Sequence, residues 1–204
     1  MLRNYPKSKN ILRRRLVLNK MAEDKSELKR CFIAIEFSDD VIKEIARVQE
    51  LIAKTKFTGK ITELENLHLT LKFLGEIDNK KLEEVKKKLK EIKFSEMKLK
   101  LGKIGTFSIH GKPNIVWVKI EGKEIYDLQK KIDEDLKDLF KPEERFMSHL
   151  TIARIKYVKD KKGFLKHIDS VHVKPIEFDV SAFKLKKSEL KPIGPVYTNI
   201  ENYQ

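Results

Sequence analysis

The chain has 204 residues, of which 40% are hydrophobic and 37% are charged, and its net charge is +14. This length is enough for one large domain or two small lobes, and no apolar run approaches the roughly 20 residues that a membrane-spanning helix needs. The single cysteine, Cys31, excludes an intramolecular disulfide and a cysteine-rich zinc site. The positive charge favours a polyanionic partner, nucleic acid first, although lysines interleaved with glutamates on helix faces explain much of it.

The first 25 residues are predicted to form a flexible basic extension. Residues 1–20 carry seven Lys or Arg side chains and no acid, and residues 1–25 lack an amphipathic period. They also lack the apolar core and cleavage site of a signal peptide, so we expect a cytoplasmic protein. Met21 is a candidate for an alternative translation start. The folded domain is expected to span 26–204.

In the first half of the folded domain, strands and helices are predicted to alternate. A strand is predicted at 30–37 and an apolar-striped helix after Ser38, whose side chain is suited to cap the first turn. A second strand follows at 66–75, and a second helix begins after Asp78. An alternating strand begins at Met97.

The same order returns in the second half of the chain. The predicted elements are a strand at 114–120, a helical stripe at 125–139, a strand at 148–155, a lysine-rich connection at 156–170 that is partly helical at most, and strands at 176–180 and 196–200. Matching positions recur at nearly equal spacings, which predicts an internal duplication. We therefore expect an α+β fold with two lobes, roughly 30–107 and 108–204, whose termini cross between the lobes. Each lobe would hold an antiparallel-type sheet beside a central cleft, with helices outside.

One short motif occurs once in each half. The stretch NLHLTLKFLG holds His68 and Thr70, and SHLTIAR holds His149 and Thr151. Residues i and i+2 of a strand point to the same face, so each motif presents one imidazole beside one hydroxyl. If the two halves pack about a pseudo-two-fold axis, both motifs face one cleft from opposite sides.

Two histidines facing one cleft are suited to an in-line displacement at phosphorus. One imidazole can take the proton of an attacking water while the other protonates the departing ribose oxygen, and the residues alone leave open which does which. The hydroxyls of Thr70 and Thr151 can donate to the non-bridging oxygens. Arg154 is a candidate for a phosphate contact, although strict alternation aims it away from His149. Two histidines without a carboxylate pair make a poor ligand set, so no metal is expected.

Several other side chains have two interpretations. Phe32, Phe73 and Trp117 are candidates to stack on a base, but their apolar strand contexts favour core packing. Lys72 alternates onto the face of the first motif, where it either adds positive potential or lies in solvent. His110, His167 and His172 have no motif partner, which favours surface or structural roles, and His110 is the only one of them considered as a residue of the cleft rim.

These motifs closely resemble the 2H phosphoesterase superfamily, and within it the RNA 2′,3′-cyclic phosphodiesterases, historically called 2′-5′ RNA ligases. The resemblance covers about residues 29–204 and includes RCFIAIEF and KSELKPIGPVYTNI. It implies a bilobal fold and hydrolysis of RNA 2′,3′-cyclic phosphate ends to 2′-phosphomonoesters without metal or other cofactor. It also implies that His68 is the proton donor, that His149 is the proton acceptor, and that the phosphate is contacted by Thr70, Thr151 and Arg154.

Two alternatives to hydrolysis remain at this stage. One is ATP-independent ligation forming 2′-5′ linkages, in which a ribose hydroxyl replaces water. The other is a non-catalytic module that binds RNA ends with its basic surface. For the hydrolase we expect a monomer that acts on RNA ends such as tRNA fragments, or on nucleotides, with no membrane partner.

Overall fold

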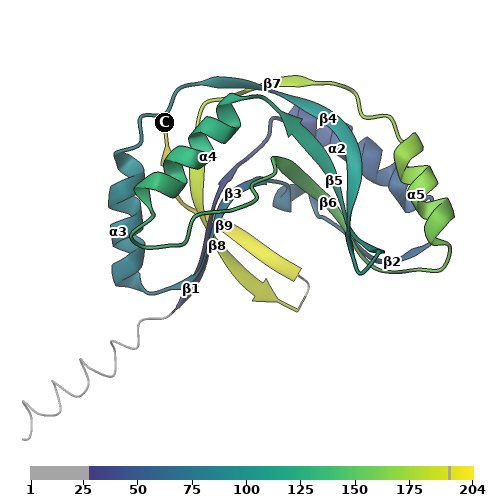
Figure 1. Ribbon diagram of the computed structural model, residues 1–204, viewed down its shortest axis with the longest axis horizontal. Helices are drawn as coiled ribbons and strands as arrows, with labels where there is room; N and C mark the ends of the chain where they lie inside the picture. The colour runs from purple at the N-terminus through teal and green to yellow at the C-terminus, as the bar shows by residue number, and fades with distance from the viewer. Residues whose placement is uncertain (1–27, 193) are drawn as a thin grey trace, which may run out of the picture.

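The computed structural model describes residues 28–192 and 194–204, which form an α+β fold as predicted (Figure 1). The extension predicted at 1–25 and the alternative start at Met21 lie outside the described residues. The described elements are β1 (Lys29–Ile35), α2 (Asp39–Ala53), β2 (Phe57–Ile61), a 3-10 turn η1 (Leu64–Asn66), β3 (Leu69–Ile77), α3 (Asn79–Lys90), β4 (Met97–Ile109), β5 (Lys112–Glu121), α4 (Glu124–Asp135), β6 (His149–Val158), α5 (Lys161–Ser170), β7 (Glu177–Val180), β8 (Phe183–Lys191) and β9 (Gly194–Tyr203).

The strands form one antiparallel sheet that curls into an arch (Figure 1). Their order is β7-β4-β5-β6-β3-β1-β8-β9, and β2 adds to β6. The two predicted sheets are joined at β3 and β6, which meet in a single register pair, Leu69 with Leu150. The strands that carry the two histidine motifs are therefore neighbours at the centre of the arch.

Strand pairing does not follow the order of the chain. The C-terminal strand β8 returns to pair with β1 and β9 pairs with β8, whereas β4 pairs with β5 and β7. Strands β2 and β8 were not predicted from the sequence. Strand β8 has the sequence FKLKKSELK, in which charged residues hide the apolar alternation that a half-buried strand needs.

Four helices cover the outer face of the arch. Helix α2 packs against β6, and α5 packs against β4 and β5. Helix α3 lies beside β9, and α4 lies beside β3 and β4. The carboxylate of Asp78 accepts a hydrogen bond from the Lys81 backbone amide at 2.7 Å, the cap predicted for α3. Ser38 occupies the N-cap position of α2, but its side chain makes no capping bond.

Helix α5 corrects the sequence-based expectation for residues 156–170. Ten of these residues form a full helix, which is capped where Asp160 accepts a hydrogen bond from the Gly163 amide at 2.9 Å. Only Phe164 and Ile168 are fully buried on it, so its apolar stripe is too short to stand out in the sequence. No helix in the described part of the chain is long and apolar enough to cross a membrane.

Candidate active site

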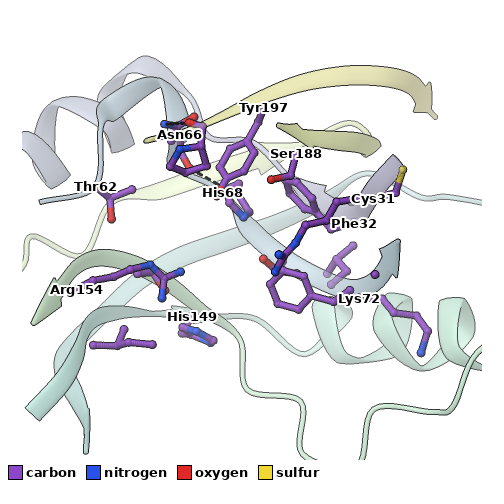
Figure 2. Close-up of a pocket in the computed structure, with 18 of the residues that line it drawn as sticks. Cys31, Phe32, Thr62, Asn66, His68, Lys72, His149, Arg154, Ser188 and Tyr197 are labelled. Atoms are coloured by element: carbon purple, nitrogen blue, oxygen red, sulfur yellow. Dashed lines mark hydrogen bonds between the residues drawn. The ribbon is translucent and has the colours of Figure 1, made fainter. Parts of the chain in front are cut away.

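A cavity of about 690 Å³ lies between the two motif strands, and all five predicted site residues line it: His68, Thr70, His149, Thr151 and Arg154. Figure 2 shows His68 beside Tyr197 on one wall, with His149 and Arg154 on the opposite wall. Because each motif residue at i and i+2 faces the same side, each wall contributes one imidazole and one hydroxyl. The cavity is therefore two-sided and nearly symmetric.

Both imidazoles are held in the same way. Nδ1 of His68 lies 2.7 Å from the backbone carbonyl of Asn66, and Nδ1 of His149 lies 2.7 Å from that of Met147. A carbonyl oxygen can only accept, so each Nδ1 carries the hydrogen and donates it. Each Nε2 is consequently the free nitrogen, a proton acceptor when the ring is neutral and a donor when it is charged.

Aromatic rings support both histidines. The ring of His68 lies 4.8 Å from that of Phe32 and 5.1 Å from that of Tyr197, and the ring of His149 lies 5.1 Å from that of Phe107. These contacts fix the tilt of each imidazole and shield its inner edge from water.

The electrostatic surroundings of His68 disfavour its charged form. Burial lowers the pKa of His68 to about 4, and the positive charges of Lys186 and Arg154 act in the same direction. The hydrogen bond to the Asn66 carbonyl and the charge of Glu36 oppose this shift only in part. In the free protein at neutral pH, the imidazole of His68 is therefore neutral.

Arg154 reaches the cavity because β6 contains a β-bulge. In the pairing with β5, Trp117 faces Thr151 and Val116 faces Ala153, so Ile152 is an extra residue. The extra residue reverses the alternation, and Arg154 comes to the same face as Thr151. Strict alternation would have placed Arg154 on the opposite face of the strand.

A matching bulge in β3 corrects the expectation for Lys72. In the pairing with β1, Ala34 faces Thr70 and Ile33 faces Lys72, which leaves Leu71 as the extra residue. Lys72 is therefore turned to the helix side, where it is 3% exposed and forms an ion pair with Asp133 of α4. It is neither solvated nor a free charge facing the motif.

The same bulge brings Phe73 to the cavity. Phe73 is 64% exposed and lines the cavity, so the prediction that it packs in the core is wrong. Aligning the two motifs, HLTLKF with HLTIAR, puts Phe73 at the position of Arg154. One half of the duplication thus presents an aromatic ring where the other presents a guanidinium group.

The other aromatic candidates do not offer a free ring to the cavity, since Phe32 is buried and Trp117 is half-buried outside it. Phe32 is 2% exposed and supports His68, and Trp117 packs against Phe107 at a ring distance of 5.3 Å. Tyr197, which is not among the residues predicted for the site, lines the cavity from β9. In the sequence, only the resemblance of the closing stretch KSELKPIGPVYTNI to the family points to Tyr197. The strand at 196–200 is predicted from the residues that alternate with Tyr197, so its pattern carries no signal for Tyr197 itself.

The remaining histidines lie away from this cavity. His110 is at the turn between β4 and β5 with a left-handed φ of 48°, and it does not line the cavity. His167 Nε2 lies 3.0 Å from the Leu51 carbonyl at the end of α2. Within residues 28–192 and 194–204 there is no group of three His, Cys, Asp or Glu side chains placed to hold a metal ion.

Comparison with known proteins identifies the class to which this fold and site belong. The family model described as LigT like Phosphoesterase matches residues 35–117 and again 118–197, in agreement with the internal duplication. The chain is 37% identical over 177 residues to an RNA 2′,3′-cyclic phosphodiesterase of Methanocaldococcus jannaschii, which covers 85% of this chain and 99% of that protein. A Thermotoga maritima protein of the same name is 34% identical over 175 residues, 82% of this chain and 91% of its own length.

Solved structures share the fold. The structure of TT0787 from Thermus thermophilus superposes with a TM-score of 0.68 at 26% identity, covering 85% of this chain and 96% of that one. Escherichia coli LigT without ligand also gives a TM-score of 0.68, at 22% identity over 87% of this chain and 97% of that one. The chain belongs to the LigT-like phosphoesterase family.

Proposed function

We propose that the protein hydrolyses RNA 2′,3′-cyclic phosphate ends to 2′-phosphomonoesters, with His68 and His149 as a metal-independent acid–base pair. The observation that carries the proposal is the pair of imidazoles, each fixed through Nδ1 so that Nε2 faces one cavity from opposite walls. The names of the relatives in Methanocaldococcus jannaschii and Thermotoga maritima support the same substrate class.

In the proposed reaction, the oxygen of a water attacks the cyclic phosphorus as the bond from phosphorus to the 3′ oxygen breaks. His149 Nε2 takes the proton of the water, and His68 Nε2 gives its proton to the departing 3′ oxygen. Thr70 and Thr151 donate hydrogen bonds to the non-bridging oxygens, and Arg154 offsets their charge. The product is a 2′-phosphomonoester with a free 3′ hydroxyl, and one proton must return to His68 before the next turnover.

The lowered pKa of His68 constrains how it acquires its proton. In the empty cavity the ring is neutral near pH 7. A phosphodiester anion bound beside Nε2 favours the charged imidazole and raises the pKa. We therefore assign the donor role to His68 in the substrate complex, where the anion and the proton bind together.

The test is hydrolysis of an oligonucleotide with a 2′,3′-cyclic phosphate end in the presence of a chelator. The expected product is the 2′-phosphomonoester, and His68→Ala and His149→Ala should each lower kcat by about 10²–10⁴-fold, the usual contribution of one proton transfer. A cyclic end that persists in chelator, or full activity in both variants, rejects the proposal.

Ligation is the second candidate, and the same cavity would perform it if a ribose hydroxyl replaced water. Adding a 5′-hydroxyl RNA to the assay distinguishes the two, because ligation gives a joined product. A pure binding module instead predicts salt-dependent RNA binding without any product, and normal binding by both histidine variants.

A further inference from the structure

The charges that line the cavity are not all accounted for by the proposed reaction. Both lysines that line the cavity in the described part of the chain are neutralised, Lys60 by Glu63 and Lys72 by Asp133. Three arginines also line the cavity, and none has an ion-pair partner within the described part of the chain: Arg30, Arg145 and Arg154. Of the carboxylates that line the cavity, Glu63 is paired with Lys60, and Glu143 has no basic partner among the described residues. The cavity therefore keeps an excess of positive charge in the form of guanidinium groups.

Arg154 is assigned to the reacting phosphate, whereas Arg30 and Arg145 lie toward the other end of the cavity. Along the segment that carries His149, Arg145 comes four residues before the histidine and Arg154 five residues after it. On the facing wall, Arg30 comes two residues before Phe32, so their Cα atoms are about 6.6 Å apart on β1. Since the ring of Phe32 contacts that of His68, Arg30 lies beyond Phe32 as seen from the reaction centre.

Both arginines line the same cavity as Phe73. Phe32 pairs in register with Phe73, and their ring centroids are 6.2 Å apart, which brings Arg30 to the Phe73 end of the wall. Arg145 lies on the connection between α4 and β6, which is held to β3 where Nζ of Lys72 donates to the Lys141 carbonyl at 2.8 Å. Arg30 and Arg145 therefore reach the cavity that Phe73 lines from two different segments of the chain.

We propose that Arg30 and Arg145 form a second phosphate subsite, which binds the phosphate on the 5′ side of the terminal nucleotide. This inference rests on the proposed function. The terminal nucleoside would then lie over Phe73, with its cyclic phosphate between the histidines and its 5′ phosphate between the two arginines. The preferred substrate is an oligonucleotide end or a 5′-phosphorylated nucleotide, and a cyclic mononucleotide without a 5′ phosphate is a poor one.

The test compares adenosine 2′,3′-cyclic phosphate, the same nucleotide with a 5′ phosphate, and a dinucleotide with a cyclic end. For the wild type we expect kcat/KM to be at least ten-fold higher for the two substrates that carry the 5′ phosphate. In Arg30→Gln/Arg145→Gln, kcat/KM for those two should fall roughly ten-fold per arginine, the usual effect of one charged hydrogen bond. The fall should exceed that for adenosine 2′,3′-cyclic phosphate by ten-fold or more.

The salt dependence of substrate binding provides a second test of the same phosphate contact. For single-stranded nucleic acid, the slope of log affinity against log salt changes by about 0.7 for each phosphate neutralised. The double variant should therefore show a shallower slope by about that amount with the 5′-phosphorylated substrate. The matched control is Lys80→Gln/Lys87→Gln, which removes two exposed charges from α3, outside the cavity, and should leave the preference and the slope unchanged.

Three outcomes overturn the inference. Equal kcat/KM for the wild type with and without the 5′ phosphate rejects the subsite, as does an equal fall for all substrates in the arginine variant. Both arginines are exposed, so the variant is expected to keep the circular dichroism spectrum of the wild type. Failure of the wild type to hydrolyse any of the three substrates rejects the proposed function itself, and the inference with it.

Discussion

At the scale of single residues, His68 links folding stability to pH. Its pKa is about 4 in the folded protein and about 6.5 in an unfolded chain, so between these values the unfolded state binds more protons. Stability contributed by the neutral ring is fully present above pH 6.5 and is lost as pH falls toward 4. The loss over this window is about 3 kcal/mol at most.

Denaturant unfolding of the wild type and of His68→Gln at pH 7.5 and pH 4.5 measures this contribution. The variant should lose less stability than the wild type between the two pH values, because it has no imidazole to titrate. NMR titration of the His68 ring with inorganic phosphate then tests the donor role. A pKa that phosphate does not raise contradicts the proposed protonation on binding.

Phe73 is expected to act as a stacking surface for the terminal base. Stacking on an aromatic ring contributes about 1–3 kcal/mol per base, so Phe73→Ala should lower kcat/KM about five- to hundred-fold, mainly through KM. Phe73→Tyr should retain most activity. The matched control is Tyr157→Ala, since Tyr157 is 63% exposed and does not line the cavity. Equal effects of Phe73→Ala and Tyr157→Ala would remove the stacking role.

At the scale of elements, the bulge in β6 is held by helix α2. The amide of Gln49, 6% exposed, donates to the Thr62 carbonyl at 2.8 Å and to the Ile152 carbonyl at 3.0 Å. Ile152 is the extra residue that turns Arg154 into the cavity. Gln49 therefore positions Arg154 without touching the substrate.

Gln49→Leu is expected to leave both carbonyls without this donor, at a cost of about 1–3 kcal/mol in folding stability, and to displace Arg154. The matched control is Val48→Ala, a fully buried neighbour on α2 that loses packing but no hydrogen bond to the bulge. At a temperature where both variants are folded, kcat/KM should fall only in Gln49→Leu. An equal kcat/KM in the two variants would confine Gln49 to a structural role.

The bulges also explain what the sequence could and could not predict. Hydrophobic periodicity predicts that His68 and Thr70 share a face, because no extra residue lies between them. Periodicity fails immediately after each threonine, where Leu71 and Ile152 break the alternation, and Lys72 and Phe73 were misassigned for that reason. Only the alignment of the two motifs carries a signal for this feature, since it puts Phe73 at the position of Arg154.

At the scale of the whole molecule, the arch depends on strands that exchange between the halves of the chain. Strand β1 from the first half lies between β3 and β8, and β5 from the second half lies between β4 and β6. The duplication and the α+β class follow from spacing along the sequence, but these pairings do not. They join segments that lie far apart in the sequence, which local periodicity does not specify.

This exchange predicts that the two halves fold as one cooperative unit. The only tryptophan, Trp117, lies on β5, whereas far-UV circular dichroism reports strands and helices throughout the chain. Thermal or denaturant unfolding followed by both signals should give coincident transitions. A circular dichroism curve with two steps, only one of them seen by Trp117, would contradict this prediction.

Separated fragments provide the stricter test of the same prediction. A fragment spanning 30–107 contains β1 and most of β4 but lacks their partners β8 and β5. A fragment spanning 108–204 contains β5 but lacks most of its partner β4. Each would expose long unpaired strand edges and an uncovered apolar face, so neither is expected to fold alone. Mixing the two should restore the circular dichroism spectrum of the intact chain, because every missing edge of one fragment is supplied by the other. Independent folding of either fragment would show that the lobes are separable domains and that the crossing strands contribute little to stability.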